Sequence, residues 1–127
     1  MLDKNMCVLV VDDQTSMRGH VRNVLKSMGF QNIVEAENGA EAARILNTHH
    51  VDFIISDWNM PMMNGLELLK HVRSDPKRGN TPFLMLTGQS ERKEILLAVA
   101  AKVNNYLVKP FTSLALEEKI AAIFGGL

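Results

Sequence analysis

Five polar residues each stand at the end of a short apolar run, and their types fit phosphoryl chemistry. They are Asp12, Asp13, Asp57, Thr87 and Lys109. Neighbouring carboxylates repel one another unless a cation neutralises them, and Mg²⁺ prefers carboxylate oxygens as ligands. A metal ion and a lysine facing one carboxylate can hold a phosphoryl group with a charge of about −1.5 to −2, and a threonine hydroxyl can donate a hydrogen bond to it. These residue types indicate a magnesium-dependent phosphoryl site, provided that the fold brings them together.

Each of these residues also has a simpler structural interpretation. Asp12 or Asp13 could cap the N-terminus of a helix. Asp57 and Thr87 could belong to turns, and Lys109 before a proline could be a solvated lysine that closes an edge strand. Taken singly, these interpretations stay open. Their common position at strand ends, on one rim of a sheet, favours a shared site.

A repeating pattern of apolar runs and helical segments positions the polar residues. The runs are Met6–Val11, Ile33–Ala36, Val51–Ser56, Phe83–Leu86 and Tyr106–Val108. Most are continuous rather than alternating, as in parallel strands covered on both faces. The segments between them have helical spacing, as in Met17, Val21 and Val24. The pattern predicts one α/β domain over residues 1–127, a doubly wound, flavodoxin-like (βα)5 fold. Its five parallel strands have the order 2-1-3-4-5, and ligands bind where strands one and three end.

The composition limits the classes of function. Lys plus Arg equals Asp plus Glu at 14 each, so the chain has no net positive charge with which to hold nucleic acid. No apolar run approaches the roughly 20 residues that span a bilayer, and the aspartates after the first run are unlike a signal peptide. Cys7, the single cysteine, is expected to be a buried thiol. We therefore expect a cytoplasmic monomer that binds neither nucleic acid nor membrane.

Four motifs together resemble the bacterial response-regulator receiver domain of two-component systems, over essentially the whole chain. They are Val8-Leu9-Val10-Val11-Asp12-Asp13, Ile54-Ile55-Ser56-Asp57-Trp58-Asn59-Met60-Pro61 with Asn64-Gly65, Leu86-Thr87-Gly88, and Tyr106-Leu107-Val108-Lys109-Pro110-Phe111. Within that family, the runs 58–61 and 109–112 are most similar to the chemotaxis type. The resemblance implies a single receiver domain without an output domain.

The resemblance implies a phosphoacceptor and a metal site. Asp57 is the expected phosphoacceptor, whose carboxylate takes the phosphoryl group from the phosphohistidine of a histidine kinase. Mg²⁺ is the expected cofactor. Its expected direct ligands are Asp13, Asp57 and the backbone carbonyl of Asn59, while Asp12 acts through water.

The remaining roles concern the bound phosphoryl group and its signal. Lys109 is expected to pair with the phosphoryl group, and its peptide bond to the following proline is expected to be cis. Thr87 is expected to move toward the phosphate, and Tyr106 to swing inward and fill the space that it leaves. Asn59 and Gln89 occupy positions that tune autodephosphorylation in the family.

The expected output is regulated protein binding rather than enzymatic turnover of a substrate. Phosphorylation is expected to alter the face of the fourth helix, fifth strand and fifth helix. The expected partners are a histidine kinase of the chemotaxis type and, in flagellar rotation, the motor switch protein or a phosphatase. A non-motor receiver acting as a phosphate sink or phosphorelay carrier stays open as the alternative. An Asp-nucleophile phosphatase fits poorly, because Asn59 stands where its general acid belongs.

Three features depart from the family pattern or stand beside its site. Lys102 stands where many receivers have a glycine after the fourth helix, and a lysine at positive φ costs roughly 1 kcal/mol. Asn104 and Asn105 replace the small residues usual before Tyr106, so we expect the end of the fourth helix to differ in register or mobility. Trp58, next to the phosphoacceptor, is expected to be partly exposed and to report on the site through its fluorescence.

Overall fold

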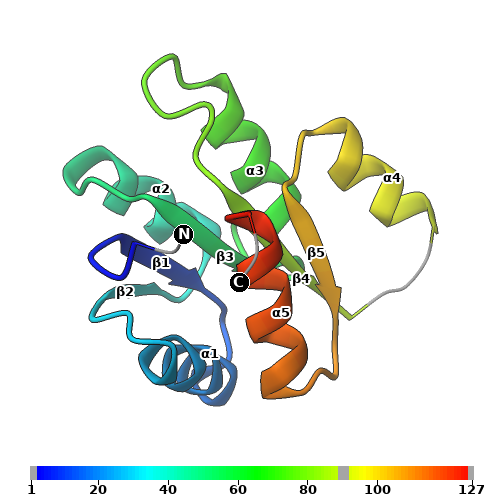
Figure 1. Ribbon diagram of the computed structural model, residues 1–127. Coiled ribbons are helices and arrows are strands. Elements are labelled where there is room, and N and C mark those ends of the chain that lie inside the picture. The colour runs from blue at the N-terminus through cyan, green and yellow to red at the C-terminus, as the bar shows by residue number, and fades with distance from the viewer. Residues whose placement is uncertain (1–2, 89–91, 126–127) are drawn as a thin grey trace.

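The computed structural model describes residues 3–88 and 92–125 and has a central sheet between two layers of helices (Figure 1). The strands are β1 (Cys7–Val11), β2 (Asn32–Ala36), β3 (Phe53–Asp57), β4 (Phe83–Thr87) and β5 (Asn105–Val108). The helices are α1 (Thr15–Ser27), α2 (Gly39–Thr48), α3 (Gly65–Ser74), α4 (Arg92–Ala100) and α5 (Ser113–Ile123). Within the described residues, no helix has the length and apolar character needed to cross a bilayer.

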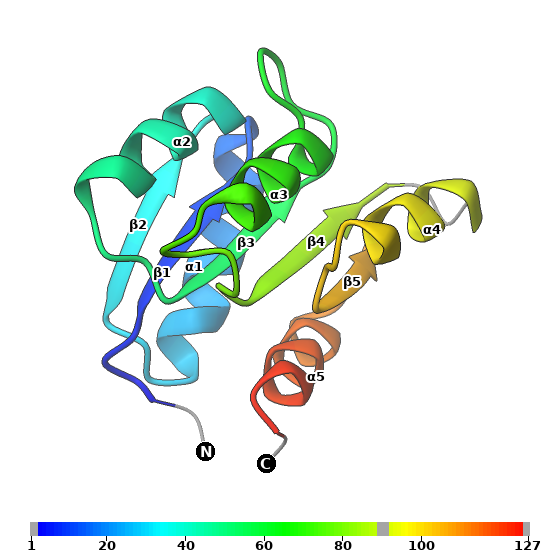
Figure 2. The same ribbon diagram turned by 90° about the horizontal axis from the view of Figure 1, so that it is seen from above.

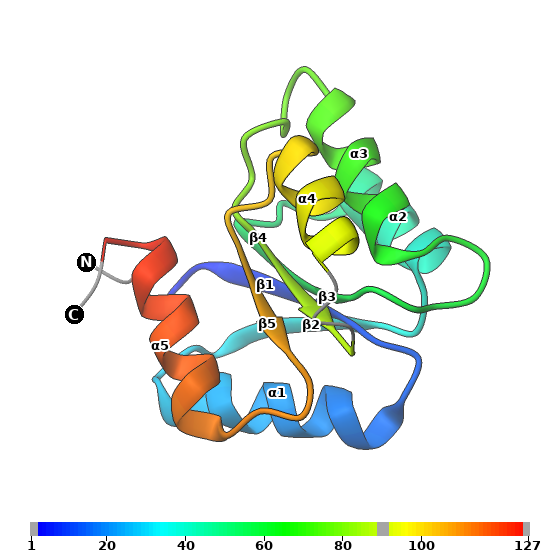
Figure 3. The ribbon, with the colours of Figure 1, turned by 90° about the vertical axis from the view of Figure 1, so that its right-hand side faces the viewer.

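All five strands run parallel in the order β2-β1-β3-β4-β5, so the predicted doubly wound fold and its strand order are confirmed. Figure 2 shows the strands side by side in this order. Figure 3 shows α1 and α5 on one face of the sheet, and α2, α3 and α4 on the other. The strand order reverses between β1 and β3, so the loops that follow these two strands diverge and leave an accessible edge there.

Alternate residues of each central strand face the two helical layers. In β1, Leu9 and Val11 belong to the cluster packed under α2, α3 and α4, whereas Val8 and Val10 belong to the cluster under α1 and α5. All four are at most 1% exposed. Cys7 is also buried, as expected. Burial on both faces explains the continuous apolar runs, since each such side chain stabilises the fold by about 1.5–3 kcal/mol.

The predicted strand bounds differ from the structure by one or two residues, most clearly at the start of β3. The expected run began at Val51, but the strand begins at Phe53. Asp52 explains the difference, because its Oδ2 accepts the N–H of Cys7 at 2.8 Å where a strand would offer a backbone carbonyl. At the other end, Asp57 is the last residue of β3, so its backbone is held in the sheet.

Side-chain caps determine where three helices begin. Asn38 at α2, Asn64 at α3 and Thr112 at α5 each accept a hydrogen bond from the backbone N–H three residues later. Glu67 completes a capping box with Asn64. Gly29 follows α1 with φ of 101°, as its position predicted. Each such cap contributes about 1 kcal/mol. The cap of α3 fixes the residue at which this helix begins, and so fixes where the loop after β3 ends.

The segment after α4 contains two of the departures from the family pattern. Lys102 has φ of 67°, so the expectation of a lysine at positive φ is confirmed. Asn104 Oδ1 accepts hydrogen bonds from the N–H of Phe83 at 2.8 Å and from Nη2 of Arg73 at 2.9 Å. Asn104 therefore ties the start of β5 to the start of β4 and to the end of α3.

Helix α4 buries only a narrow stripe of its apolar surface. Ala98 is 1% exposed and packs on the sheet. Leu96, Leu97 and Val99 are 54%, 42% and 56% exposed. The helix thus presents an apolar surface to solvent beside β5.

Candidate functional site

The carboxyl ends of β1 and β3 bring three aspartates together at the point where the strand order reverses. Asp12, Asp13 and Asp57 each offer a carboxylate oxygen, and these oxygens lie within 4.8 Å of one another. Asp12 is 1% exposed and Asp57 6%, whereas Asp13 is exposed. The cluster therefore has a buried base and one side open to solvent.

A lysine from the end of β5 enters this cluster. Lys109 Nζ lies 3.0 Å from Asp57 Oδ1 and 3.2 Å from Asp12 Oδ2. Its backbone N–H donates to the carbonyl of Thr87 at 2.7 Å, which holds it beside the end of β4. The side chain of Lys109 is only 18% exposed, so the interpretation as a solvated lysine is wrong. The peptide bond between Lys109 and Pro110 is cis, as the resemblance implied.

The charges in the cluster are only partly compensated. Burial is the main cause that raises the pKa of Asp57; the charge of Asp12 adds to it, and the hydrogen bond from Lys109 opposes it. Burial alone would lower the pKa of Lys109, but its hydrogen bonds to the two carboxylates and their charges raise it, so Lys109 stays cationic. Lys109 pairs with two of the three clustered carboxylates, Asp12 and Asp57, and the excess negative charge favours a further cation.

The turn between β1 and α1 is held by Arg18, which the sequence analysis did not identify. Its Nη1 donates to the carbonyl of Asp12 at 2.7 Å, and its Nε donates to Glu35 at 3.3 Å. Asp12 Oδ1 accepts the N–H of Gln14, and Gln14 is itself the N-cap residue of α1. The interpretation of Asp12 or Asp13 as the cap is therefore wrong. A cation in the first turn of a helix, where acidic residues are favoured, was the signal for Arg18.

The loop between β3 and α3 orients the carboxylate of Asp57. The N–H of Trp58 donates to Asp57 Oδ1 at 2.9 Å, and the N–H of Gly65 donates to the carbonyl of Trp58 at 2.8 Å. A Cβ on Gly65 would collide with the carbonyl oxygen of Asp57, so this approach of α3 requires glycine. Trp58 is 7% exposed and belongs to the core under α4, so the expectation of a partly exposed tryptophan is wrong.

Thr87 and Tyr106, the expected signalling pair, lie beside a small gap under α4. Thr87 is 3% exposed, and Tyr106 is half-buried, with Lys119 Nζ 5.5 Å from its ring centroid. The gap has a volume of about 10 Å³, room for about one water. Glu94 also lines it, and its Oε2 is buried without a hydrogen-bond partner in the described part of the chain. Glu94 is a functional candidate that its helical spacing alone did not reveal.

The two residues expected to tune autodephosphorylation are placed differently. Asn59 follows Trp58 in the loop after β3 and is exposed. Gln89 lies outside the described residues. The structure therefore brings together Asp12, Asp13, Asp57, Thr87 and Lys109, while Asn59 is an exposed residue of the loop that follows Asp57.

The donor set of the cluster fits Mg²⁺. All three convergent groups are carboxylates, which are hard oxygen ligands. The ion keeps several of its waters, so one or two carboxylates and an open side are enough. The exposed position of Asp13 provides this open side.

Comparison with known proteins agrees with this geometry. The family model described as "Response regulator receiver domain" matches residues 8–121. The chain is 45% identical over 124 residues to chemotaxis protein CheY-3 of Vibrio cholerae serotype O1, covering 98% of this chain and 95% of that protein. Chemotaxis protein CheY of Pseudomonas aeruginosa is 44% identical over 119 residues, which is 94% of this chain and 96% of that protein.

A solved structure gives the same result for the fold. Chemotaxis response regulator CheY4 of Vibrio cholerae matches with a TM-score of 0.87 and 34% sequence identity, covering 94% of this chain and 98% of that one. The family match spans β1 through most of α5, including the strand ends that carry the acidic cluster and its lysine. The chain therefore belongs to the response regulator receiver domain family.

Proposed function

We propose that this protein is a cytoplasmic receiver that is phosphorylated on Asp57 by a histidine kinase of the chemotaxis type. The supporting observation is the asymmetric environment of the Asp57 carboxylate. Lys109 and the N–H of Trp58 both bind Oδ1. Oδ2 has no hydrogen-bond partner among residues 3–88 and 92–125, so it is the oxygen with a free lone pair.

The proposed reaction is an in-line phosphoryl transfer. Oδ2 of Asp57 attacks the phosphorus of a phosphohistidine, an O–P bond forms, and the P–N bond breaks as the imidazole leaves. Lys109, already 3.0 Å from Oδ1, pairs with the phosphoryl oxygens and lowers the free energy of the developing charge. Transfer from the kinase is thus a single step at this carboxylate, and the chain is a phosphoacceptor rather than an enzyme with an external product.

Four groups are proposed to hold Mg²⁺. Asp13, Asp57 and the backbone carbonyl of Asn59 are the direct ligands, and Asp12 acts through water. When bound, the ion neutralises the carboxylates and the incoming phosphoryl oxygens. Burial and the charge of Asp12 raise the pKa of Asp57, and a cation beside it opposes both effects, so the carboxylate is available as a nucleophile at neutral pH.

The proposed signal runs from the phosphoryl group through Thr87 and Tyr106 to the α4–β5–α5 face. A charge-assisted hydrogen bond from the Thr87 hydroxyl contributes about 1.5–3 kcal/mol. That free energy shifts a two-state equilibrium about tenfold to a hundredfold. The exposed Leu96, Leu97 and Val99 of α4 support a protein partner on this face. The motor switch protein or a phosphatase is the proposed partner, because two relatives are named as chemotaxis proteins.

Phosphorylation with acetyl phosphate tests the proposal directly. Intact-mass spectrometry is expected to show one added phosphoryl group with Mg²⁺ and none with EDTA. Asp57→Asn is expected to abolish the addition, and Asp13→Asn to require far more Mg²⁺. Asp75→Asn, a matched change outside the cluster, is expected to react like the wild type. Phosphorylation of Asp57→Asn at the wild-type rate would overturn the assignment.

A binding assay then separates the two outputs. Tyr106 and α4 are the proposed readers of the signal, so affinity for the purified motor switch protein is expected to rise about tenfold or more on phosphorylation. Tyr106→Ala is expected to remove this rise without blocking phosphorylation. Equal affinity with and without acetyl phosphate would instead favour the phosphate-sink or phosphorelay function.

A further inference from the structure

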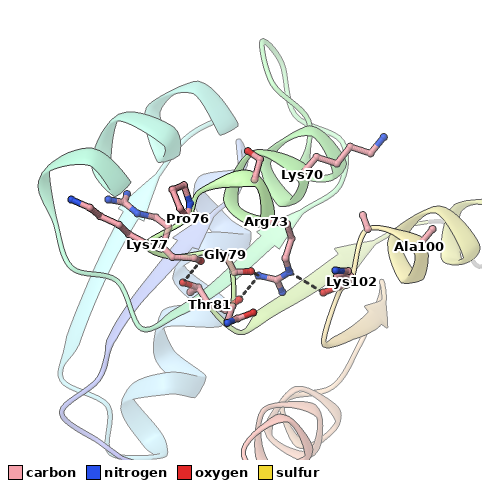
Figure 4. A pocket seen from close by; sticks show the side chains of 12 residues that line it. Lys70, Arg73, Pro76, Lys77, Gly79, Thr81, Ala100 and Lys102 are labelled. Atoms are coloured by element: carbon pink, nitrogen blue, oxygen red, sulfur yellow. Dashed lines mark hydrogen bonds between the residues drawn. The ribbon is translucent and has the colours of Figure 1, made fainter.

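A basic groove lies beside the start of β4 (Figure 4), whereas the three aspartates lie at the carboxyl ends of β1 and β3. We define it by its five cations: Lys70, Arg73, Lys77, Arg78 and Lys102. They come from α3, the loop before β4 and the turn after α4, and the groove has a volume of about 620 Å³. No Asp or Glu is among the described residues that line it. β4 begins beside the groove and ends beside the aspartates. The length of this strand, about 13 Å, therefore separates the groove from the phosphorylation site.

Arg73 supplies a fixed and uncompensated charge at the centre of the groove. Its Nε donates to the carbonyl of Lys102 at 3.0 Å, and its Nη1 donates to the carbonyls of Gly79 and Thr81 at 3.1 Å and 2.6 Å. Its Nη2 donates to the amide oxygen of Asn104. All four acceptors are neutral, and burial lowers the pKa of Arg73. A nearby negative charge would therefore relieve an existing electrostatic cost.

The surrounding cations are free to meet a ligand. Lys70, Lys77 and Lys102 are exposed and take part in no ion pair within the described part of the chain. Asp75 is the acidic residue beside the groove: its Oδ2 lies 3.3 Å from Nε of Arg78, and its Oδ1 accepts the backbone N–H of Lys77 at 2.8 Å. In Figure 4, Arg73 lies between Lys77 on one side and Lys102 on the other. The positive charge is thus spread along the groove rather than gathered at one point.

The hollow continues beyond the groove toward α2. A second hollow of about 240 Å³ shares Lys77, Arg78 and Thr81 with the first and is also lined by His49 and His50. Together the two hollows run across the segments at the starts of β4 and β3, from the end of α4 to the end of α2. This elongated shape fits an extended chain better than a compact ligand.

We propose that the basic groove binds an acidic, extended segment of a partner protein. Spaced cations on exposed side chains complement spaced carboxylates, and the half-buried Arg73 gives the groove a charge that salt screens less than it screens the exposed lysines. A nucleotide fits less well, since no aromatic side chain is among the described residues that line the basic groove itself. Of the two histidines in the second hollow, His50 is held by Asp52 at 2.7 Å. The site is separate from Asp57 and does not depend on phosphorylation.

The test uses the full chain and a fluorescent peptide of about 12 residues in which Glu and Asp alternate with Ser and Gly. Binding is measured by anisotropy, and the site by ¹⁵N–¹H chemical shifts, at about 0.02 M and 0.3 M NaCl. The wild type is expected to bind at low salt with shifts in the amides of residues 70–81 and 100–104. The same peptide with Gln and Asn in place of Glu and Asp is expected not to bind.

Matched charge variants decide between a site and a general charge effect. Lys70→Gln with Lys77→Gln is expected to weaken binding about tenfold. Lys4→Gln with Lys26→Gln removes the same charge at the end of α1 on the other face of the sheet, and is expected to change affinity less than twofold. Both variants remove only exposed side chains, and circular dichroism checks that they fold.

Several outcomes would overturn the proposal. These are shifts outside the groove, equal weakening by the two variants, or tighter binding of single-stranded oligonucleotide or inorganic phosphate than of the peptide. The first two would mean that the peptide senses overall charge, and the last that the groove recognises phosphate. Asp57→Asn is expected to bind the peptide like the wild type. Loss of phosphorylation and loss of this site are therefore distinguishable.

Discussion

Replacing Asp57 with asparagine is expected to stabilise the metal-free protein. The carboxylate is 6% exposed and shares a small space with Asp12, which is 1% exposed. Burial and this neighbouring charge raise the pKa of Asp57 above its ordinary value, although Lys109 opposes the effect. At neutral pH the folded protein therefore holds an ionised group that is more stable in the unfolded chain.

The size of the gain follows from the geometry. The clustered carboxylate oxygens of Asp12 and Asp57 lie at most 4.8 Å apart. At an effective dielectric constant of about 20, two negative charges at that distance repel each other by ~3.5 kcal/mol. The attraction of Lys109 at 3.0 Å is ~5.5 kcal/mol on the same basis. Desolvation of the carboxylate costs several kcal/mol. Asp57→Asn removes the repulsion from Asp12 and the desolvation cost, but it also loses the attraction of Lys109. The free energy of unfolding is therefore expected to rise by about 1–2 kcal/mol.

The pH dependence has a definite sign. Because the folded pKa of Asp57 is raised, the folded state binds its proton more tightly than the unfolded state does. The stability from this protonation is fully present below the unfolded pKa and is lost as pH rises through the folded pKa. The difference in free energy of unfolding between Asp57→Asn and the wild type should therefore be small near pH 4 and reach its full value by pH 7. Urea unfolding in EDTA, followed by circular dichroism, measures it.

Two controls make this prediction refutable. Glu118→Gln removes an exposed carboxylate of α5 that is in no ion pair among the described residues, and should change stability by less than about 0.5 kcal/mol. Saturating Mg²⁺ at about 100 times its Kd should stabilise the wild type by ~2.7 kcal/mol and the variant by less. A variant less stable than the wild type at pH 7 in EDTA, or a gain independent of pH, would refute the reasoning.

Three further substitutions test the packing around the site and the groove. Asn104→Ala removes the acceptor of two hydrogen bonds and is expected to cost about 2 kcal/mol in urea unfolding, whereas the exposed Asn80→Ala should cost almost nothing; equal effects would contradict this. Gly65→Ala places a methyl group against the carbonyl of Asp57 and is expected to cost about 1–3 kcal/mol and to slow phosphorylation by acetyl phosphate; a wild-type rate would count against it. Lys102→Gly relieves a φ of 67° and is expected to raise the free energy of unfolding by about 0.5–1 kcal/mol, and a lower melting temperature would contradict this.

The strands that were easiest to predict are those buried on both faces. β1, β3 and β4 are buried along their whole length, so each appears in the sequence as a continuous apolar run. β2 and β5 are the two outer strands of the sheet and are mostly only half-buried, and the predicted run for β5 was the shortest of the five. The cluster could be predicted for a related reason. The carboxyl ends of parallel strands lie on the same side of a sheet, so a polar residue that directly follows a buried run can be placed on that side from the sequence.

The features that could not be predicted depend on contacts between distant segments. Trp58 follows a strand directly, and it is 7% exposed because it belongs to a core cluster to which α2, α3 and α4 all contribute. Arg73 and Asn104 are 31 residues apart, and no sequence motif at either position predicts that they form a hydrogen bond. Glu94 looks like an ordinary surface residue of a helix, yet it lines the gap beside Thr87, and its Oε2 is buried without a hydrogen-bond partner in the described part of the chain. Local periodicity carries no information about such pairs.

Net charge is the clearest case of a sequence property that conceals structure. The chain has 14 basic and 14 acidic residues, from which we expected no positive field. The fold nevertheless separates the charges, with three aspartates at the carboxyl ends of β1 and β3 and five cations in the basic groove beside the start of β4. Lys102 and Asn104, which looked like separate departures from the family pattern, both contact Arg73 in that groove. A net charge of zero therefore excludes a uniformly charged surface but does not exclude a local patch of positive charge. For this reason the groove has to be tested with variants that remove the same number of charges from different places.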